Sequence, residues 1–213
     1  LSGKAVEATI GDQNCIFLKE LYNLEKNCAQ LLQKLAEGSV PWIDVDPKTA
    51  IPLVEEKLNI ELANSQKEAL HTALHSKLLI LTGGPGVGKT TLVNSLLSIL
   101  EKQNLKVALC APTGRAAKKL AESTNKKAKT IHRLLEMNPL QKVFQRNETD
   151  PLECDLLVVD EFSMVDITLF RSLLQAIPSS AAVLFVGDVD QLPSIGPGSV
   201  LKDMISSKQI SVV

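Results

Sequence analysis

The amino-acid sequence predicts an α/β fold, in which a parallel β-sheet is covered by helices on both faces and is preceded by a small α+β segment. Three observations support this fold. Four short runs after residue 53 are apolar throughout, amphipathic segments of helical length separate them, and the residues before them follow a different pattern. Fully apolar strands are typical of a parallel sheet, because both faces of such a sheet are covered.

Length and composition limit how the chain can be organised. With 213 residues, 45% of them hydrophobic, it can form one full core and a small appendage, since a domain takes roughly 100 to 200 residues. We expect residues 1–50 to be the end of a preceding small domain with its linker, and residues 51–213 to be one domain. Because the chain begins with Leu1 rather than Met, we expect it to be part of a longer protein.

The sequence carries no targeting or membrane signal. No apolar run approaches the roughly 20 residues that span a bilayer, and the N-terminus lacks the layout of a signal peptide. The four cysteines, Cys15, Cys28, Cys110 and Cys154, form no CxxC pair of the kind found in zinc sites. We therefore expect a cytoplasmic protein without membrane contact.

The first fifty residues predict a β-hairpin followed by a helix. We expect strands at Val6–Ile10 and Cys15–Leu18, joined by a turn-rich tetrapeptide. Apolar side chains then recur at helical spacing from Leu21 to Leu35, and Gly38 is placed to end that helix. Pro41–Pro52 contains three prolines, each of which resists helix. We therefore expect a linker and a domain boundary in this segment.

The second part of the chain alternates strands and helices. The apolar runs predict strands at Leu78–Leu81, Val107–Cys110, Leu156–Val159 and Val183–Val186. Amphipathic segments predict helices at Lys89–Glu101, Gly114–Glu122 and Ile167–Ile177. Upstream, Ser65 and Glu68 have the spacing of a capping box, so we expect Ser65 to open a further helix. Gln66 then stays free, and an amide with a donor and an acceptor could read an adenine edge through two hydrogen bonds.

The strongest chemical signal is a glycine-rich run between an apolar run and a helical pattern. It reads Gly83-Gly84-Pro85-Gly86-Val87-Gly88-Lys89-Thr90 and fits the pattern GxxxxGK[ST]. Backbone N–H groups in such a loop surround phosphate oxygens, and the N-terminus of the following helix adds a favourable dipole. Lys89 is then expected to reach the outer phosphates, and Thr90 to offer its hydroxyl to Mg²⁺.

Two acidic motifs follow later strands. The run Leu156–Val159 ends in Asp160 and Glu161, and α/β sheets bind ligands at such strand ends. We expect Asp160 to hold Mg²⁺ and Glu161 to orient and deprotonate the attacking water. The run Gly187–Pro193 follows the next strand, and the amide of Gln191 suits a sensor of the γ-phosphate; an ordinary turn is the alternative. Together these motifs predict nucleotide hydrolysis.

Charge is partitioned along the chain although the formal net charge is only -1. Lys102–Arg146 contains eleven Lys and Arg against two acids, whereas Asn147–Asp190 contains nine acids against the single base Arg171. Such asymmetry suggests one surface for polyanions and another for cations. Ordinary solvated faces are the alternative explanation.

The order and spacing of these motifs resemble the RecD-type superfamily-one helicases. The resemblance covers about Leu53–Val213 and rests on Leu62–Gln66, the glycine-rich loop, Ala111–Ala117, Thr130–Arg133, Asp160–Met164 and Gly187–Gly198. It implies a RecA-like P-loop NTPase fold, ATP and Mg²⁺ as cofactors, and single-stranded DNA as partner. It also implies 5′-to-3′ unwinding in DNA repair or recombination. The last motif is more like the stand-alone RecD-like helicases than the subunit of the RecBCD complex, and partner subunits leave no recognisable motif.

The resemblance assigns roles residue by residue. It implies catalytic roles for Lys89, Glu161 and Gln191, and metal binding by Thr90 and Asp160. It implies nucleotide contacts by Gln66, Gly84, Pro85, Gly86, Val87, Gly88, Lys89, Thr90 and Thr91. It implies contacts with single-stranded DNA by Pro112, Thr113, Gly114, Arg115 and His132. With only 3% aromatic residues, we expect phosphate contacts to dominate over base stacking.

Two other classes of protein share part of this pattern. An AAA+ or clamp-loader-like ATPase would have the same loop and acidic strand, but Gly187–Pro193 and Thr130–Arg133 favour a helicase. A nucleotide-gated binding module would not need Glu161 beside Asp160. His71 and His75 have the spacing of zinc ligands, but Thr72 stands where the HExxH motif requires Glu.

Helicases of this family continue into a second RecA-like domain beyond the position of Val213. Arginines from that second domain complete the ATP site, and a transition-state arginine is worth about 10³ to 10⁵ in turnover. We therefore expect the 213-residue chain to bind nucleotide, to hydrolyse it slowly and not to unwind DNA.

Overall fold

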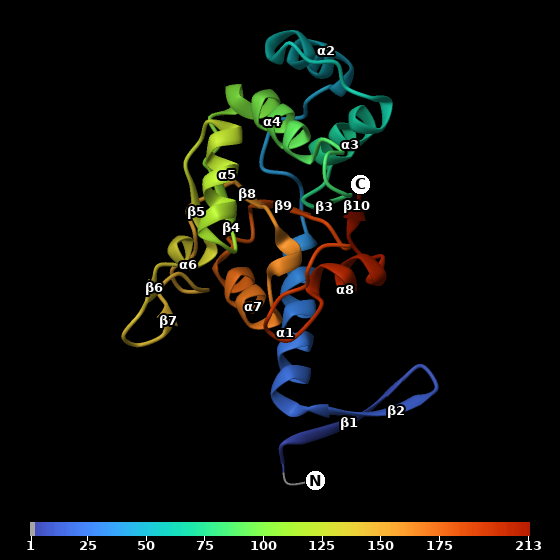
Figure 1. Ribbon diagram of the computed structural model, residues 1–213, viewed down its shortest axis with the longest axis vertical. Helices are drawn as coiled ribbons and strands as arrows, with labels where there is room; N and C mark the ends of the chain where they lie inside the picture. Colours follow the sequence, from blue (N-terminus) through green and yellow to red (C-terminus); the bar gives the residue numbers. More distant parts are fainter. Residues whose placement is uncertain (1–2) are drawn as a thin grey trace.

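A six-stranded parallel sheet forms the centre of the molecule (Figure 1). The computed structural model describes residues 3–213. The strand order is β10-β3-β9-β8-β4-β5, and neighbouring strands pair in parallel throughout. The strands are β3 (Leu78–Thr82), β4 (Val107–Ala111), β5 (Ala128–Thr130), β8 (Leu156–Val159), β9 (Ala182–Gly187) and β10 (Ser211–Val212). The expected α/β fold is therefore confirmed, and its four predicted strands agree with the structure to within one residue at either end.

Side chains of each strand alternate between two buried clusters, as the two-residue period of a strand requires. Leu78 and Ile80 belong to one cluster, whereas Leu79 and Leu81 belong to the other. The first cluster is covered by α1 (Lys19–Ala36), α7 (Ile167–Ala176) and α8 (Val200–Ser207). The second is covered by α2 (Pro47–Leu58), α3 (Asn64–His75), α4 (Lys89–Leu100) and α5 (Gly114–Thr124). Helices therefore cover both faces of the sheet.

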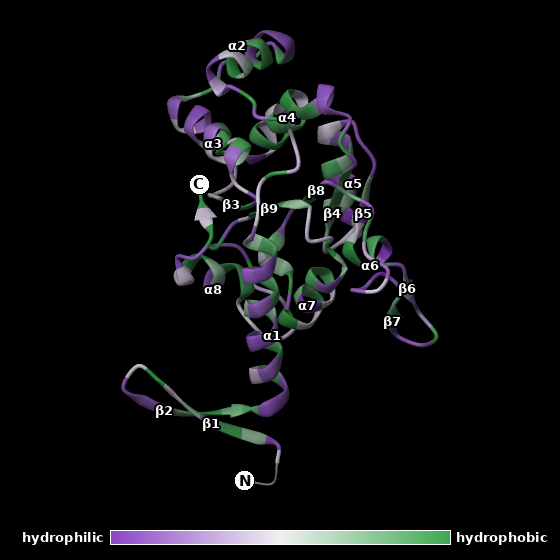
Figure 2. Cartoon of the chain, turned by 180° about the vertical axis from the view of Figure 1, so that it is seen from behind, coloured by the Kyte–Doolittle hydropathy of each residue, from purple (hydrophilic) through white to green (hydrophobic). Residues whose placement is uncertain are grey.

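The N-terminal hairpin and helix also form as expected. Strand β1 (Ala5–Ile10) pairs antiparallel with β2 (Gln13–Leu18), and α1 follows directly. Cys28 and Leu35 of α1 are buried in the same cluster as Phe170 of α7. The hairpin lies at the far end of α1 from the sheet, and Figure 2 shows apolar stretches along it.

The predicted linker at Pro41–Pro52 is wrong in its second half, because helix α2 begins at Pro47. Proline is favourable at the first helical position, where its missing N–H would have no partner, and the Asp46 side chain caps the same turn by accepting from Lys48 N at 3.1 Å. Pro52 lies inside the helix at the loss of one backbone hydrogen bond. Burial of its neighbours Ile51 and Val54 in the cluster of α4 offsets that loss.

The cap of α3 also differs from the prediction. The helix begins at Asn64, so Ser65 lies inside its first turn and is not the capping residue. The N-cap is Ala63, and the third helical residue, Gln66, reaches back to it, because its Oε1 accepts a hydrogen bond from the backbone N–H of Ala63 at 3.0 Å. Gln66 is therefore not the free side chain that the sequence suggested.

Several short elements were not predicted. They are the helix α6 (Ile131–Leu134), the strands β6 (Met137–Asn138) and β7 (Val143–Phe144), the 3-10 turns Glu101–Gln103 and Phe162–Met164, and α8, β5 and β10. Strands β6 and β7 form a small hairpin that projects beside α6 (Figure 1). Within residues 3–213, no helix has the length and apolar character needed to cross a bilayer.

Candidate functional site

The nucleotide motifs leave three neighbouring strands at the same edge of the sheet. Thr82 pairs with Gly187 across β3 and β9, and Val159 pairs with Phe185 across β8 and β9. The glycine-rich loop, the run after β9 and the acidic pair after β8 therefore begin side by side. The carboxyl edge of a parallel sheet is where α/β proteins bind ligands.

The phosphate loop, residues Gly83–Thr90, has a backbone that requires glycine. Gly83, Gly86 and Gly88 have φ of 149°, 83° and 91°, in the region that glycine adopts at low cost. A Cβ on Gly88 would lie 2.4 Å from Nε2 of Gln66. Helix α4 begins at the next residue, so its first N–H groups lack helical partners and are available to an anion.

Lys89 folds back onto the phosphate loop. Its Nζ donates hydrogen bonds to the carbonyl oxygens of Gly83 and Gly84, the second at 2.9 Å. The ammonium group is only part-buried and lies close enough to Asp160 to favour that carboxylate electrostatically. Thr90, in the first turn of α4, has an exposed side chain. Lys89 is therefore held by the loop itself, and the Thr90 side chain faces solvent beside it.

The acidic pair after β8 has an unusual backbone. Asp160 Oδ1 accepts a hydrogen bond from the backbone N–H of Glu161 at 2.9 Å, and Glu161 has the left-handed φ of 50°. A non-glycine residue costs about 1–2 kcal/mol in that conformation. Strain of this kind is typical of functional sites, where it sets the direction of a side chain.

Burial raises the pKa of Asp160 above its usual range, although the N–H of Glu161 and the charges of Lys119 and Lys89 act in the opposite direction. A divalent cation would favour the ionised form in the same way. The oxygens of Asp160 and Thr90 fit Mg²⁺, which commonly binds to one or two protein oxygens and completes its shell with phosphate and water. Among the described residues, no three acidic, His or Cys side chains gather to hold a metal by themselves.

The run Gly187–Pro193 packs directly against the acidic motif. A Cβ on Gly187 would lie 3.2 Å from the backbone nitrogen of Ser163, so the two segments are in contact. Asp188 is only 2% exposed, and its Oδ1 accepts from Asp190 N at 3.0 Å. Sequence reasoning singled out Gln191, whose side chain is exposed, but missed Asp188 as the centre of this turn. Its position directly after an apolar strand and Gly187 was the available signal.

Gln66 connects helix α3 to the phosphate loop. In addition to capping Ala63, its Nε2 donates a hydrogen bond to the carbonyl oxygen of Val87 at 3.3 Å. One side chain therefore contacts both the first turn of α3 and the loop. The structure brings Gln66 to the phosphate loop, but through contacts that the sequence did not suggest.

The residues expected to contact DNA leave the next two strands. Pro112, Thr113, Gly114 and Arg115 follow β4, where Thr113 caps α5 by accepting from Ala116 N at 3.2 Å. His132 lies in α6 just after β5, and Ala111 pairs with Thr130 across those strands. The two groups are therefore neighbours. They meet the nucleotide group where Asp160 N donates to Cys110 O at 2.9 Å.

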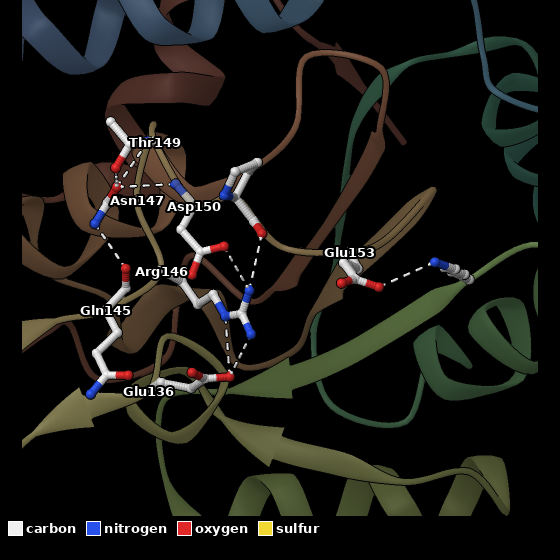
Figure 3. Close-up of polar contacts among 9 residues, drawn as sticks. Glu136, Gln145, Arg146, Asn147, Thr149, Asp150 and Glu153 are labelled. Atoms are coloured by element: carbon white, nitrogen blue, oxygen red, sulfur yellow. Dashed lines mark hydrogen bonds and ion pairs between the residues drawn. The ribbon is translucent and has the colours of Figure 1, made fainter.

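Not every base in the basic stretch is available to DNA. Figure 3 shows the guanidinium of Arg146 between two carboxylates, at 3.0 Å from Glu136 and 3.1 Å from Asp150. These contacts raise the pKa of Arg146 through its hydrogen bond to Glu136. Lys106 pairs with Glu153 at 3.2 Å in the same region. Arg146 is therefore held in a partly buried ion-pair network, whereas the Lys106–Glu153 pair lies on the surface and Arg115 and His132 are exposed.

Comparison with known proteins identifies relatives of this arrangement. A family described as an AAA domain matches residues 66–197. The chain is 38% identical over 201 residues to the ATP-dependent RecD2 DNA helicase of Deinococcus radiodurans, covering 91% of this chain and 26% of the relative. It is 34% identical over 197 residues to the RecBCD enzyme subunit RecD of Mycolicibacterium smegmatis, covering 81% and 35%.

A solved structure gives a further likeness. The crystal structure of Pif1 helicase from Candida albicans aligns with 64% of this chain and 34% of that chain, at 28% identity and a TM-score of 0.49. The chain spans about a quarter to a third of the length of the two curated relatives named above.

Proposed function

Because this chain belongs to the RecD-type helicase family and carries its AAA domain, we propose that it binds ATP with Mg²⁺ and holds single-stranded DNA as part of a helicase motor. In this proposal residues 51–213 are the first RecA-like motor domain. Residues 1–50, of which the first two lie outside the described part, are the end of a preceding small domain. This division concerns function and does not mark a structural boundary. Helix α1 packs on α7, and α2 spans residue 50.

One observation carries the proposal: the residues expected to bind ATP and those expected to bind DNA lie at the same carboxyl edge of the sheet. The hydrogen bond from Asp160 N to Cys110 O joins the acidic strand end to β4, whose next residues are Pro112–Arg115. A change of backbone conformation at Asp160 and Glu161 can therefore be transmitted through this hydrogen bond to Pro112–Arg115. Coupling between nucleotide state and DNA grip is what a motor requires.

The residues expected to bind and hydrolyse ATP then have the following roles. Backbone N–H groups of Gly84, Gly86, Val87 and Gly88 and those at the start of α4 hold the phosphates. Lys89 leaves the loop carbonyls to contact the outer phosphates. Thr90 and Asp160 hold Mg²⁺, which when bound supplies positive charge beside the transferring phosphoryl group. Glu161 orients the attacking water and accepts its proton. Gln191 is the candidate sensor of the γ-phosphate, and Gln66 that of the adenine.

The residues that follow β4 and β5 hold one DNA strand mainly through the phosphates of that strand. Arg115 and Lys119 are exposed one turn apart on α5, and Lys129 and Arg133 flank His132. Binding through such contacts depends on salt and tolerates any sequence. In the intact protein we propose alternate closing and opening of two RecA-like domains on the strand. We further propose 5′-to-3′ movement and a role in DNA repair or recombination.

Equilibrium binding tests the proposal in this chain. A fluorescent ATP analogue with Mg²⁺ and a fluorescein-labelled oligo(dT) are titrated separately with the wild-type chain. Lys89→Ala is expected to weaken nucleotide binding about tenfold or more and to leave the DNA affinity within about twofold, while Arg115→Ala is expected to do the reverse. Nucleotide binding without any DNA binding would contradict the helicase assignment and favour an AAA+ ATPase of another kind.

A further inference from the structure

The ring of His132 rests on the ring of Phe144, a residue that sequence reasoning did not select. Their centroids are 5.6 Å apart with an interplanar angle of 52°. Phe144 is half-buried against the cluster under α7, whereas His132 is exposed. The imidazole is therefore in tilted contact with an aromatic ring, and His132 as a whole faces solvent.

The small hairpin that supplies Phe144 is tied down at its base. The chain leaves at Leu135, which is fully buried, and returns where the backbone N–H groups of Gln145 and Arg146 both donate to Leu135 O at 3.2 Å. The Arg146 guanidinium then binds Glu136 and Asp150 (Figure 3). Phe144 lies two residues before Arg146, so this closure determines where its ring lies.

Helix α6, which carries His132, is held by a separate contact. The Thr130 hydroxyl caps it by accepting from Arg133 N at 3.2 Å, and Ile131 is fully buried. Met137 stands directly opposite Phe144 in the hairpin register and is 37% exposed, so it adds apolar surface beside Phe144. The result is a supported aromatic and apolar surface next to the strand end that carries Pro112–Arg115.

Such a surface suits a nucleobase better than a phosphate. Phosphates are bound by flexible cations and by backbone N–H groups, and Arg115 and Lys129 supply the cations nearby. A flat ring backed by a second ring presents a π-face, on which bases of any identity stack. We propose, building on the proposed function, that His132 backed by Phe144 is a stacking platform for one base of the bound single strand, and that Arg146 is a positioning residue that holds the pair.

Salt dependence separates stacking from a phosphate contact. Each lost phosphate contact to a single strand lowers the slope of log affinity against log salt by about 0.7, whereas a lost stack leaves the slope unchanged. We expect His132→Ala to weaken oligo(dT) binding about tenfold at constant slope, and His132→Tyr to stay within about threefold of wild type. Arg115→Ala is the opposite control, with a shallower slope.

A base analogue reports the stack directly. A 2-aminopurine placed at successive positions of the oligonucleotide is expected to be quenched at one position by the wild-type chain and to recover its fluorescence with His132→Ala. Phe144→Leu, which keeps a large apolar side chain in the half-buried position, is expected to give the same loss of affinity with an unchanged slope. Circular dichroism confirms that each variant is folded.

The outcomes distinguish this inference from the function on which it rests. If the wild-type chain binds no oligonucleotide, the proposed function fails. If it binds and His132→Ala either has wild-type affinity or lowers the salt slope as Arg115→Ala does, only the platform fails.

The role of Arg146 is tested by combining substitutions. In an Arg146→Gln background, His132→Ala is expected to lower the oligo(dT) affinity by less than a further twofold, because the platform is already displaced. A full tenfold further loss in the double variant would show that Arg146 acts independently of His132 and overturn its positioning role.

Discussion

Gln66 donates a hydrogen bond from its Nε2 to the carbonyl oxygen of Val87 in the phosphate loop, at 3.3 Å. The same amide accepts from the N–H of Ala63 at 3.0 Å through its oxygen. The side chain therefore holds the first turn of α3 and the phosphate loop together. In the proposed function it also recognises adenine, so recognition of the base and the shape of the phosphate loop depend on one residue.

Replacing Gln66 with Ala tests that connection. We expect the ATP affinity to fall about tenfold and the preference for ATP over GTP to shrink, with a loss of about 1 kcal/mol in the free energy of unfolding. Gln103 is a matched control, because it makes the same two kinds of hydrogen bond with Ile43, at 3.2 and 3.4 Å. Gln103→Ala should lower stability similarly and leave ATP affinity at the wild-type value.

Gly88 is a position in the phosphate loop where a side chain would be strained. Its φ is 91°, and a Cβ would meet Gln66 Nε2 at 2.4 Å. We expect Gly88→Ala to cost about 1–2 kcal/mol of stability from the left-handed backbone, measured by urea unfolding, and to displace Gln66. Gly84 is the control, since nothing lies within 4 Å of its Cβ position. Equal losses in the free energy of unfolding for Gly88→Ala and Gly84→Ala would contradict a special backbone constraint at Gly88.

Lys77 joins the N-terminal segment to the sheet at the edge opposite the candidate site. It is 9% exposed and donates to the carbonyls of Glu37 and Ser179, the latter at 2.7 Å. Lys77→Met should cost about 2–4 kcal/mol, because it leaves these two carbonyls without their charged donor. Lys106→Met, which removes an exposed pair with Glu153, should cost no more than about 0.5 kcal/mol. Thermal and urea unfolding of the two variants measure the difference.

Asp160 predicts a pH dependence of stability. Burial raises its pKa in the folded chain above the ordinary value of 3.8, so the unfolded chain ionises first as pH rises and the folded state loses relative stability through that window. Asp160→Asn should therefore be more stable than wild type at pH 7, and the gain should vanish only well below pH 3.8, where the carboxyl is protonated in both the folded and the unfolded chain. The amide can still accept from Glu161 N. Urea unfolding across pH measures the gain, and a variant less stable than wild type at neutral pH would contradict this sign.

The central sheet could be predicted because its signal is local. Runs such as Leu156–Val159 are apolar throughout, and the phosphate loop and the acidic pair follow strands directly, so the parallel order brings them together at one edge. Position along a strand was enough to place these residues. Their mutual geometry, such as the left-handed backbone of Glu161, depends on tertiary contacts and was not contained in the pattern.

The misses have specific physical causes. Counting Pro47 and Pro52 as helix breakers concealed α2, because proline is tolerated in a first turn and burial of neighbouring residues outweighed the second proline. The cap of α3 was assigned to Ser65 by spacing alone, whereas Gln66 makes the bond. Strands of two residues such as β6 and β7 carry no periodicity, so the position of Phe144 beneath His132 could not be inferred from the sequence.

The most direct test of the motor assignment is steady-state ATP turnover by the proposed full-length motor protein, with and without single-stranded DNA. We predict strong stimulation by DNA, and a fall of about 10² to 10⁴ when Glu161→Gln removes the proposed base while ATP binding is retained. Turnover that is indifferent to DNA, or that survives Glu161→Gln, would contradict the account.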